Sequence, residues 1–194
     1  MGQRVVNNLN HKKALVLLSG GLDSFACAHF LKKQGYKVNS IFFNFNQASV
    51  IEERKSAKKI AQYLNIELEE VSVVFNSSFT AGEIRGRNAF LLSCALTQWK
   101  ESNGLVALGI HAGTQYFDCS ESFLNLMNSI FDGCTANQVR VFAPFISWGK
   151  SQIFEYCKIN NIPLNLTYSC EMGTVPTCGS CLSCQDRKKY EFGC

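Results

Sequence analysis

Long hydrophobic runs and blocks of positive charge are both missing from this chain of 194 residues. No stretch approaches the roughly 20 apolar residues that a membrane-spanning helix needs, so we expect no membrane partner. The net charge of +4 comes without a Lys/Arg block and gives no support for nucleic-acid binding. Met1–Lys13 is polar and the apolar run after it has only five residues, so we expect no secretion signal and a cytoplasmic location.

Linkers, internal repeats and low-complexity tracts are also absent from the sequence. A chain of this length suits one domain with a core that needs no cross-links. We therefore assign residues 1–165 to the main domain and residues 166–194 to a cysteine-rich tail that packs on it.

Apolar runs alternate with helix-like segments along the chain. The expected strands are 14–18, 37–45, 66–74, 105–110 and 139–142. The expected helices are 24–33, 49–65 (opened by a Ser49-x-x-Glu52 capping box), 88–102, 121–131 and 149–160. This alternation predicts an α/β fold with a doubly wound, mostly parallel five-stranded sheet. In such sheets, ligands bind at the carboxyl ends of the strands, near the point where strand order reverses.

A glycine-containing loop directly follows the first apolar run and opens the first helix. It reads Ser19-Gly20-Gly21-Leu22-Asp23-Ser24. Glycines let the backbone approach phosphate oxygens, and the N–H groups of a first helical turn point at an anion. No Lys follows as in a Walker A loop, and the dinucleotide Gly-x-Gly-x-x-Gly pattern is absent. The alternative is a plain strand-to-helix turn in which Asp23 or Ser24 only caps the helix.

Further candidate residues follow the second and fourth strands, which end at the same edge of the predicted sheet. Phe43, Asn44 and Gln47 follow the second strand, and Gly109 lies at the end of the fourth. We expect these residues beside the loop, together with the segment 111–118.

Nine of the ten cysteines fall into two groups, and the tenth, Cys194, is the last residue. Five are scattered singly along the chain: Cys27, Cys94, Cys119, Cys134 and Cys157. Most of these five are interpreted as small core residues. Four others crowd into fifteen positions: Cys170, Cys178, Cys181 and Cys184. Four thiolates suit tetrahedral Zn²⁺ and leave no position for water, so the metal is expected to be structural. An iron–sulfur cluster, a redox dithiol or plain buried cysteines are the alternatives.

The loop resembles the SGGxDS pyrophosphate loop of the N-type ATP pyrophosphatases, and loop and tail together resemble the 7-cyano-7-deazaguanine synthase (QueC) family. The resemblance covers about residues 14–187, with further matching segments at 44–52, 84–91 and 167–187. There are departures too. Ala48 and Ser49 stand where the family has Arg and His, His111 replaces an Asn, and the segment 109–119 is shortened.

The resemblance implies an adenine nucleotide alpha hydrolase-like fold and an ATP-dependent, AMP-forming carbon–nitrogen ligase. Such an enzyme adenylates 7-carboxy-7-deazaguanine and captures it with ammonia, giving an amide and then 7-cyano-7-deazaguanine. Residues 19–24 would hold pyrophosphate, and Asp23 either helps to place Mg²⁺ or caps the helix. Arg87 would neutralise phosphate or carboxylate charge and Lys150 would reach the phosphates; the alternatives are a surface Arg and a solvated Lys. His111 is either a base or a structural residue.

The resemblance also implies a homodimer, the usual oligomeric state of the family. Two other functions are open. In the first, a divergent QueC-like ligase of an antiviral defence operon joins the activated deazaguanine to a protein amine as an amide. In the second, the chain is an ATP-binding partner subunit without turnover. The shortened segment 109–119 would fit a remodelled acceptor site in the first of these.

Overall fold

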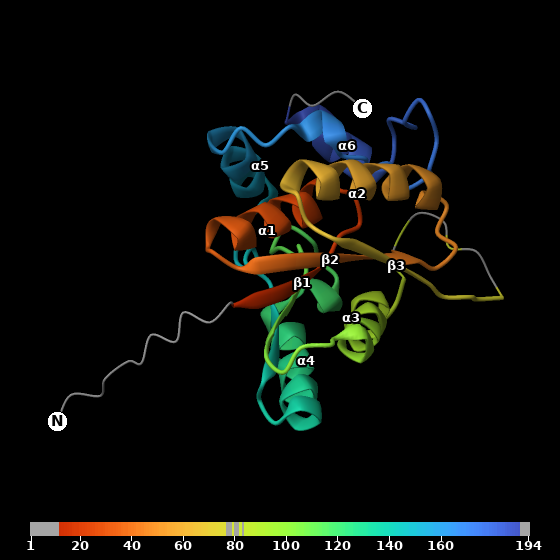
Figure 1. The fold of residues 1–194 in the computed structure, drawn as a ribbon. Coiled ribbons are helices and arrows are strands. Elements are labelled where there is room, and N and C mark those ends of the chain that lie inside the picture. The colour runs from red at the N-terminus through yellow and green to blue at the C-terminus, as the bar shows by residue number, and fades with distance from the viewer. Residues whose placement is uncertain (1–11, 77–78, 80–81, 83, 191–194) are drawn as a thin grey trace.

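The structure is a computed structural model that describes residues 12–76, 79, 82 and 84–190. Strands and helices alternate along the chain (Figure 1). The strands are β1 (Lys13–Leu17), β2 (Lys37–Asn44), β3 (Leu68–Ser72), β4 (Gly104–Ala107) and β5 (Val139–Phe142). The helices are α1 (Leu22–Lys33), α2 (Val50–Leu64), α3 (Arg87–Gln98), α4 (Glu121–Thr135), α5 (Lys150–Ile159) and α6 (Leu182–Lys189), with short 3-10 turns η1 (Phe117–Cys119) and η2 (Leu164–Leu166).

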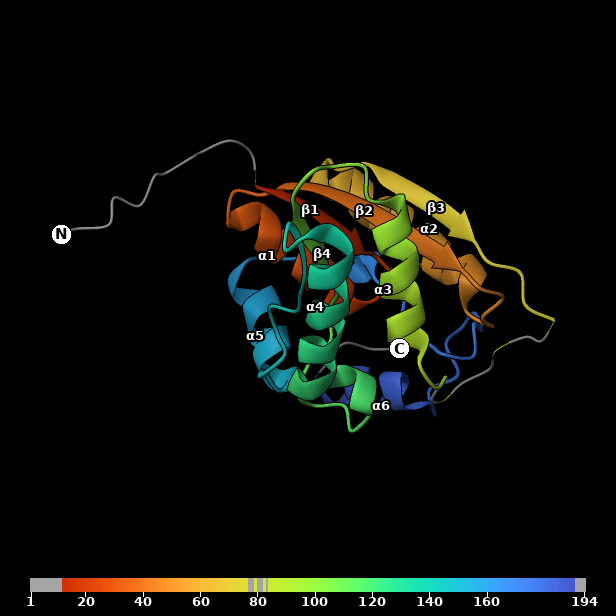
Figure 2. The same cartoon turned by 90° about the horizontal axis from the view of Figure 1, so that it is seen from below.

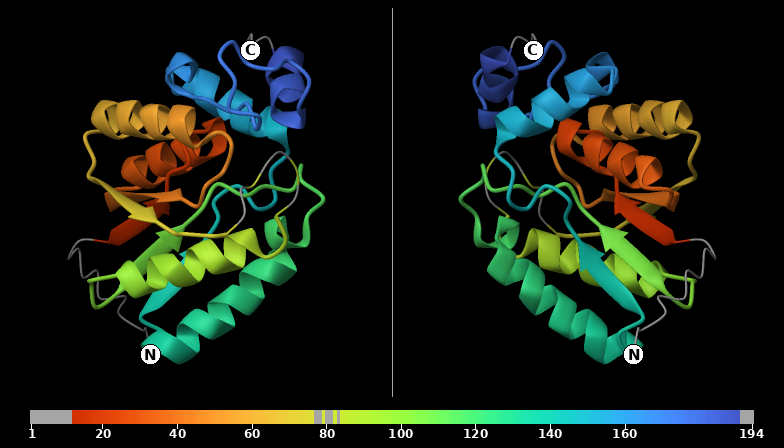
Figure 3. Two further views of the ribbon diagram at one scale, coloured as in Figure 1. Left: turned by 90° about the vertical axis from the view of Figure 1, so that its right-hand side faces the viewer. Right: turned by 90° about the vertical axis from the view of Figure 1, so that its left-hand side faces the viewer.

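The five strands form one parallel sheet in the order β3-β2-β1-β4-β5. Helices α1, α2 and α5 cover one face, and α3 and α4 lie side by side over the other (Figures 2 and 3). The predicted doubly wound α/β fold is confirmed. Strand order reverses between β1 and β4, so the carboxyl ends of these two strands form the crevice in which ligands of such sheets bind.

Each face of the sheet has its own apolar core. Phe25 of α1 and Ile153 of α5 are fully buried in one core, and Leu92 of α3 and Phe131 of α4 are fully buried in the other. Helix α1 is buried nearly all round, because α2 and α5 flank it. Cys27 lies in this core, as predicted for a small apolar residue, and burial raises its pKa far above the ordinary thiol value.

The boundaries differ from the expected ones where tertiary contacts decide them. The predicted capping box at α2 is wrong: the Ser49 hydroxyl donates to the Glu53 carboxylate (2.8 Å), and Glu52 pairs with Lys55. Helix α3 ends at Gln98, because Trp99 has an extended backbone that leads into β4. Helix α6 was not predicted, since its sequence has no apolar periodicity. No helix in the described part of the chain is long and apolar enough to cross a membrane.

Candidate active site

The loop between β1 and α1 is shaped by its first glycine. Gly20 has a φ of +87°, and a Cβ there would lie 2.4 Å from the Glu53 carbonyl oxygen of α2. The Ser24 hydroxyl donates to the Gly21 carbonyl (2.9 Å), and the Ser19 hydroxyl donates to the Ser24 oxygen (3.2 Å). No side chain caps the first turn of α1, so its N–H groups are available to an anion.

A cavity of about 740 Å³ opens beside this loop, at the carboxyl edge of the sheet. This volume is in the usual range for small-molecule sites. Ten of the residues predicted from the sequence line it: Ser19, Gly21, Leu22, Asp23, Ser24, Phe43, Gln47, Arg87, Gly109 and Lys150. Gly20 packs beneath the loop against α2, and Asn44 donates to Ser72 (3.4 Å), so neither is among the described lining residues.

Asp23 and Lys150 form a half-buried ion pair that lines the cavity. Asp23 lies in the first turn of α1 and Lys150 is the first residue of α5, so the carboxyl ends of different strands bring them together. The Lys150 Nζ donates to both carboxylate oxygens of Asp23, at 2.7 and 2.6 Å. The carboxylate therefore pairs with a cation and does not cap α1, and the ammonium is not a solvated surface group.

His111, in the segment that follows β4, faces the same carboxylate. Its Nδ1 accepts from the Gly113 N–H (3.0 Å), so the neutral ring carries its proton on Nε2, which lies 3.9 Å from the Asp23 carboxylate. Burial lowers the pKa of His111, Asp23 raises it and Lys150 lowers it again, which leaves the pKa below the usual value. A neutral ring with this tautomer is a hydrogen-bond donor toward the cavity and not a base.

A second cluster of polar side chains lies where α2 and α3 begin. Arg87 starts α3, and its Nε donates to the Asn88 side-chain oxygen (3.4 Å). Asn88 is buried and donates from its own side chain to the Asp118 carbonyl (3.0 Å), so the shortened segment 109–119 braces this corner. Sequence reasoning missed Glu53, which reads as an ordinary polar helix residue. It lines the cavity and accepts from the Ser49 hydroxyl.

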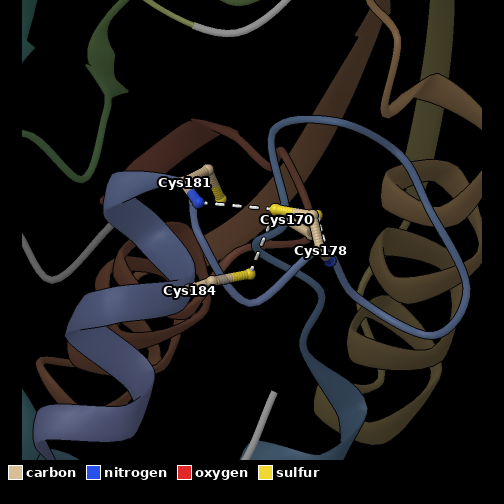
Figure 4. A group of neighbouring side chains, drawn as sticks. All are labelled: Cys170, Cys178, Cys181 and Cys184. Atoms are coloured by element: carbon tan, nitrogen blue, oxygen red, sulfur yellow. Dashed lines mark hydrogen bonds between the residues drawn. The ribbon is translucent and has the colours of Figure 1, made fainter.

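The four clustered cysteines of the tail bring their sulfurs together (Figure 4). All four sulfur atoms lie within 4.8 Å of one another. Tetrahedral Zn²⁺ with bonds of about 2.3 Å needs sulfurs about 3.8 Å apart, so a small contraction of this cluster suits the ion. Burial raises the pKa of Cys170, but hydrogen bonds from backbone N–H groups, that of Cys178 foremost, outweigh it and lower the pKa to about 5. The donor set fits a closed structural zinc site.

The tail also forms one wall of the cavity. Helix α6 begins next to Cys181 and turns Ser183 and Asp186 toward the cavity. Arg187 donates to the Thr167 hydroxyl (2.8 Å), which ties α6 to the preceding segment. The Tyr168 N–H donates to the Gly20 carbonyl (3.0 Å), so the tail touches the phosphate loop directly.

The chain matches the family model described as "Queuosine biosynthesis protein QueC" over residues 13–84 and 76–191. It belongs to the QueC family. A relative from Sulfurimonas denitrificans named 7-cyano-7-deazaguanine synthase is 31% identical over 93% of this chain and 92% of its own length. One of the same name from Oceanobacillus iheyensis is 33% identical over 91% of each chain.

The fold has a solved counterpart as well. A structure described as a predicted subunit of tRNA methyltransferase from Methanocaldococcus jannaschii aligns with a TM-score of 0.52 over 75% of both chains. Their sequence identity of 16% shows a shared fold and nothing about activity.

Two further side chains of the second polar cluster donate to Glu53. The Ser49 hydroxyl donates to its carboxylate (2.8 Å). Gln47 donates to the same carboxylate (3.0 Å) and to the Phe43 carbonyl (3.1 Å). The Gln47 side chain therefore fixes the backbone at the carboxyl end of β2, and its amide N–H groups already donate to Phe43 and Glu53.

His111 should make the stability of the fold depend on pH. Between its lowered pKa in the folded protein and the usual value of 6.5, the unfolded chain binds a proton that the folded chain does not. The free energy of unfolding therefore falls as pH falls through this window. We expect His111→Asn, whose side-chain oxygen can still accept from Gly113, to flatten this slope.

Urea unfolding at about pH 7.5 and about pH 5.5 measures the effect. The pKa of His29 is also lowered, mainly by burial. Because His29 is present in both proteins, the difference between the wild-type slope and the His111→Asn slope reports on His111 alone. Equal slopes for wild type and variant would contradict the assigned environment of His111.

Proposed function

We propose that this member of the QueC family is an AMP-forming ligase that uses ATP to activate the carboxylate of 7-carboxy-7-deazaguanine and captures it with ammonia. The observation that carries the proposal is the uncapped loop 19–24 at the strand-order reversal, beside the Asp23–Lys150 pair and in a cavity that also contains Arg87. Making an amide from a carboxylate and an amine in water is uphill, so the acid needs activation first.

In the first step, a carboxylate oxygen of the substrate attacks the α-phosphorus of ATP. The bond from that phosphorus to the β-phosphate oxygen breaks, which gives an acyl-adenylate and pyrophosphate. The N–H groups of the first turn of α1, with the hydroxyls of Ser19 and Ser24, would bind the departing pyrophosphate; the uncapped start of α1 supports this role. Lys150 supplies positive charge beside the loop.

Mg²⁺ would enter with the triphosphate, and Asp23 is the carboxylate nearest to the loop. Both of its oxygens already accept from Lys150, so the phosphates would supply most of the metal's ligands. We assign Asp23 chiefly to holding Lys150 in position.

In the second step, ammonia attacks the activated carbonyl carbon, AMP leaves with the former carboxylate oxygen, and an amide forms. A second ATP would activate the amide oxygen in the same way, and loss of AMP would leave the nitrile. The relatives named 7-cyano-7-deazaguanine synthase support the nitrile as the end product.

The departures from the QueC pattern favour a second candidate. Ala48 and Ser49 and the shortened segment 109–119 lie at the strand ends that face the substrate, where an altered acceptor site would be built. In this candidate a protein amine takes the place of ammonia and the product is a protein-linked amide. An ATP-binding partner subunit without turnover is a third candidate function. A homodimer is a separate hypothesis that is compatible with all three.

The test is a reaction with ATP, ammonium and 7-carboxy-7-deazaguanine whose carboxylate carries ¹⁸O. The proposal expects pyrophosphate, AMP that contains one ¹⁸O, and a nitrile in mass spectrometry. An accumulating amide or adenylate, converted to a conjugate when a cell lysate is added, would favour the protein amine. ADP and orthophosphate would contradict the proposal, and no AMP with any acceptor would favour the partner subunit.

A further inference from the structure

A carboxylate and a guanidinium face the cavity from opposite sides of the sheet. Glu53 comes from α2, which covers one face, and Arg87 comes from α3, which covers the other (Figures 1 and 3). Burial raises the pKa of Glu53, while the hydrogen bonds from Gln47 and Ser49 and, after them, the positive charge of Arg87 lower it. Glu53 accepts hydrogen bonds from Gln47 and Ser49, Arg87 donates to Asn88, and both side chains line the cavity.

The Glu53 carboxylate is held in a fixed orientation. One oxygen accepts from the Gln47 amide (3.0 Å) and the other from the Ser49 hydroxyl (2.8 Å). Gln47 and Ser49 are only 8% and 4% exposed, and the Gln47 side chain also bonds to the backbone of Phe43 and Phe45. An ionised carboxylate has about four acceptor sites, so each oxygen keeps capacity for another donor. Glu53 is half-buried at the cavity wall, where further donors to its carboxylate oxygens would be favourable.

We propose that Glu53 binds the ring N–H and the adjacent exocyclic amine of the deazaguanine base, while Arg87 binds the carboxylate at the other end of that molecule. This inference rests on the proposed function. A guanine-type edge offers two neighbouring donors, which match the two oxygens of one carboxylate. The corresponding edge of adenine offers one donor beside one acceptor, which Glu53 would not accommodate. Glu53 is therefore a specificity-determining residue for the base and not for ATP.

Equilibrium binding tests the inference without turnover. The ligands are 7-carboxy-7-deazaguanine, its analogue without the exocyclic amine, and ATP, each measured by calorimetry. We expect wild type to prefer the complete base by about 10- to 100-fold, as for hydrogen bonds to a charged group. Glu53→Gln should weaken binding of the complete base by about 100-fold, reduce the preference over the analogue to a few-fold, and leave ATP binding within about threefold. Glu155→Gln, at an exposed position of α5, is the matched control.

Three results would overturn the inference. Unchanged affinity of Glu53→Gln for the base is the first, an unchanged preference over the analogue is the second, and an equal loss of ATP affinity is the third. If wild type itself fails to bind the base, the proposed function falls as well, so the two failures are distinguishable.

Should Glu53→Gln not fold, Ser49→Ala serves in its place. That variant keeps the carboxylate but removes the hydroxyl that orients one of its oxygens. We expect about threefold to tenfold weaker binding of the base and unchanged binding of ATP. Equal affinity of wild type and Ser49→Ala for the base would count against the assignment.

Discussion

Replacing Gly109 with alanine is expected to lower kcat/KM by about 100-fold or more, because it forces the phosphate loop away from the end of β4. A Cβ at Gly109 would lie 2.5 Å from the carbonyl carbon and oxygen of Asp23 and 2.8 Å from the Ser24 nitrogen. These are backbone atoms of the first turn of α1, so no side chain can rotate to relieve the clash. Overpacking of this kind costs about 1–3 kcal/mol of stability, and a shift of about 1 Å at a reacting group costs about 100-fold in rate.

Pyrophosphate release and thermal unfolding measure the two effects of Gly109→Ala. Gly133→Ala, in α4, is the matched control, because a Cβ there meets nothing within 4 Å. That control should keep wild-type activity and gain up to about 1 kcal/mol of stability from helix propensity. Near wild-type activity in Gly109→Ala would mean that β4 and the loop are not held together as closely as the structure has them.

The glycine loop and the cysteine cluster could be predicted because each is formed by a few residues that lie close together in the sequence. Glycines between a strand and a helix indicate phosphate binding, and cysteines at short spacing indicate a metal, whatever the rest of the chain does. The alternation of strands and helices likewise sufficed to place residues from three distant segments at one edge of the sheet.

The rest of the site depends on contacts between distant segments. The pairing of Lys150 with Asp23 joins residues 127 positions apart, and no spacing rule predicts it. Glu53 was missed because Glu52 and Glu53 are equally polar in sequence, and only the rotation of α2 points one of them into the cavity. The capping box failed for the same reason, since Ser49 donates to Glu53 instead.

The tail should matter for activity as well as for stability. Loss of one zinc ligand in Cys181→Ser is expected to cost at least about 3 kcal/mol, because the ion holds a segment with almost no apolar core of its own. For a domain of this size that corresponds to a fall in Tm of roughly 6–12 °C. Activity should fall with it, since α6 lines the cavity and the Tyr168 N–H holds the Gly20 carbonyl.

Metal analysis, thermal unfolding and pyrophosphate release on the same preparations test this coupling. Cys134→Ser is the control, because Cys134 is an exposed cysteine of α4 outside the cluster. Its free energy of unfolding should stay within about 0.5 kcal/mol of the wild-type value, as expected of a surface change. Wild type and Cys134→Ser should carry one zinc ion per chain, and Cys181→Ser should not. An iron–sulfur cluster would show instead as iron and visible absorbance. If the ion holds α6 at the wall of the cavity, its removal must shift that wall and lower both Tm and the rate of pyrophosphate release. Unchanged Tm and unchanged pyrophosphate release after zinc removal would therefore contradict a structural role for the metal.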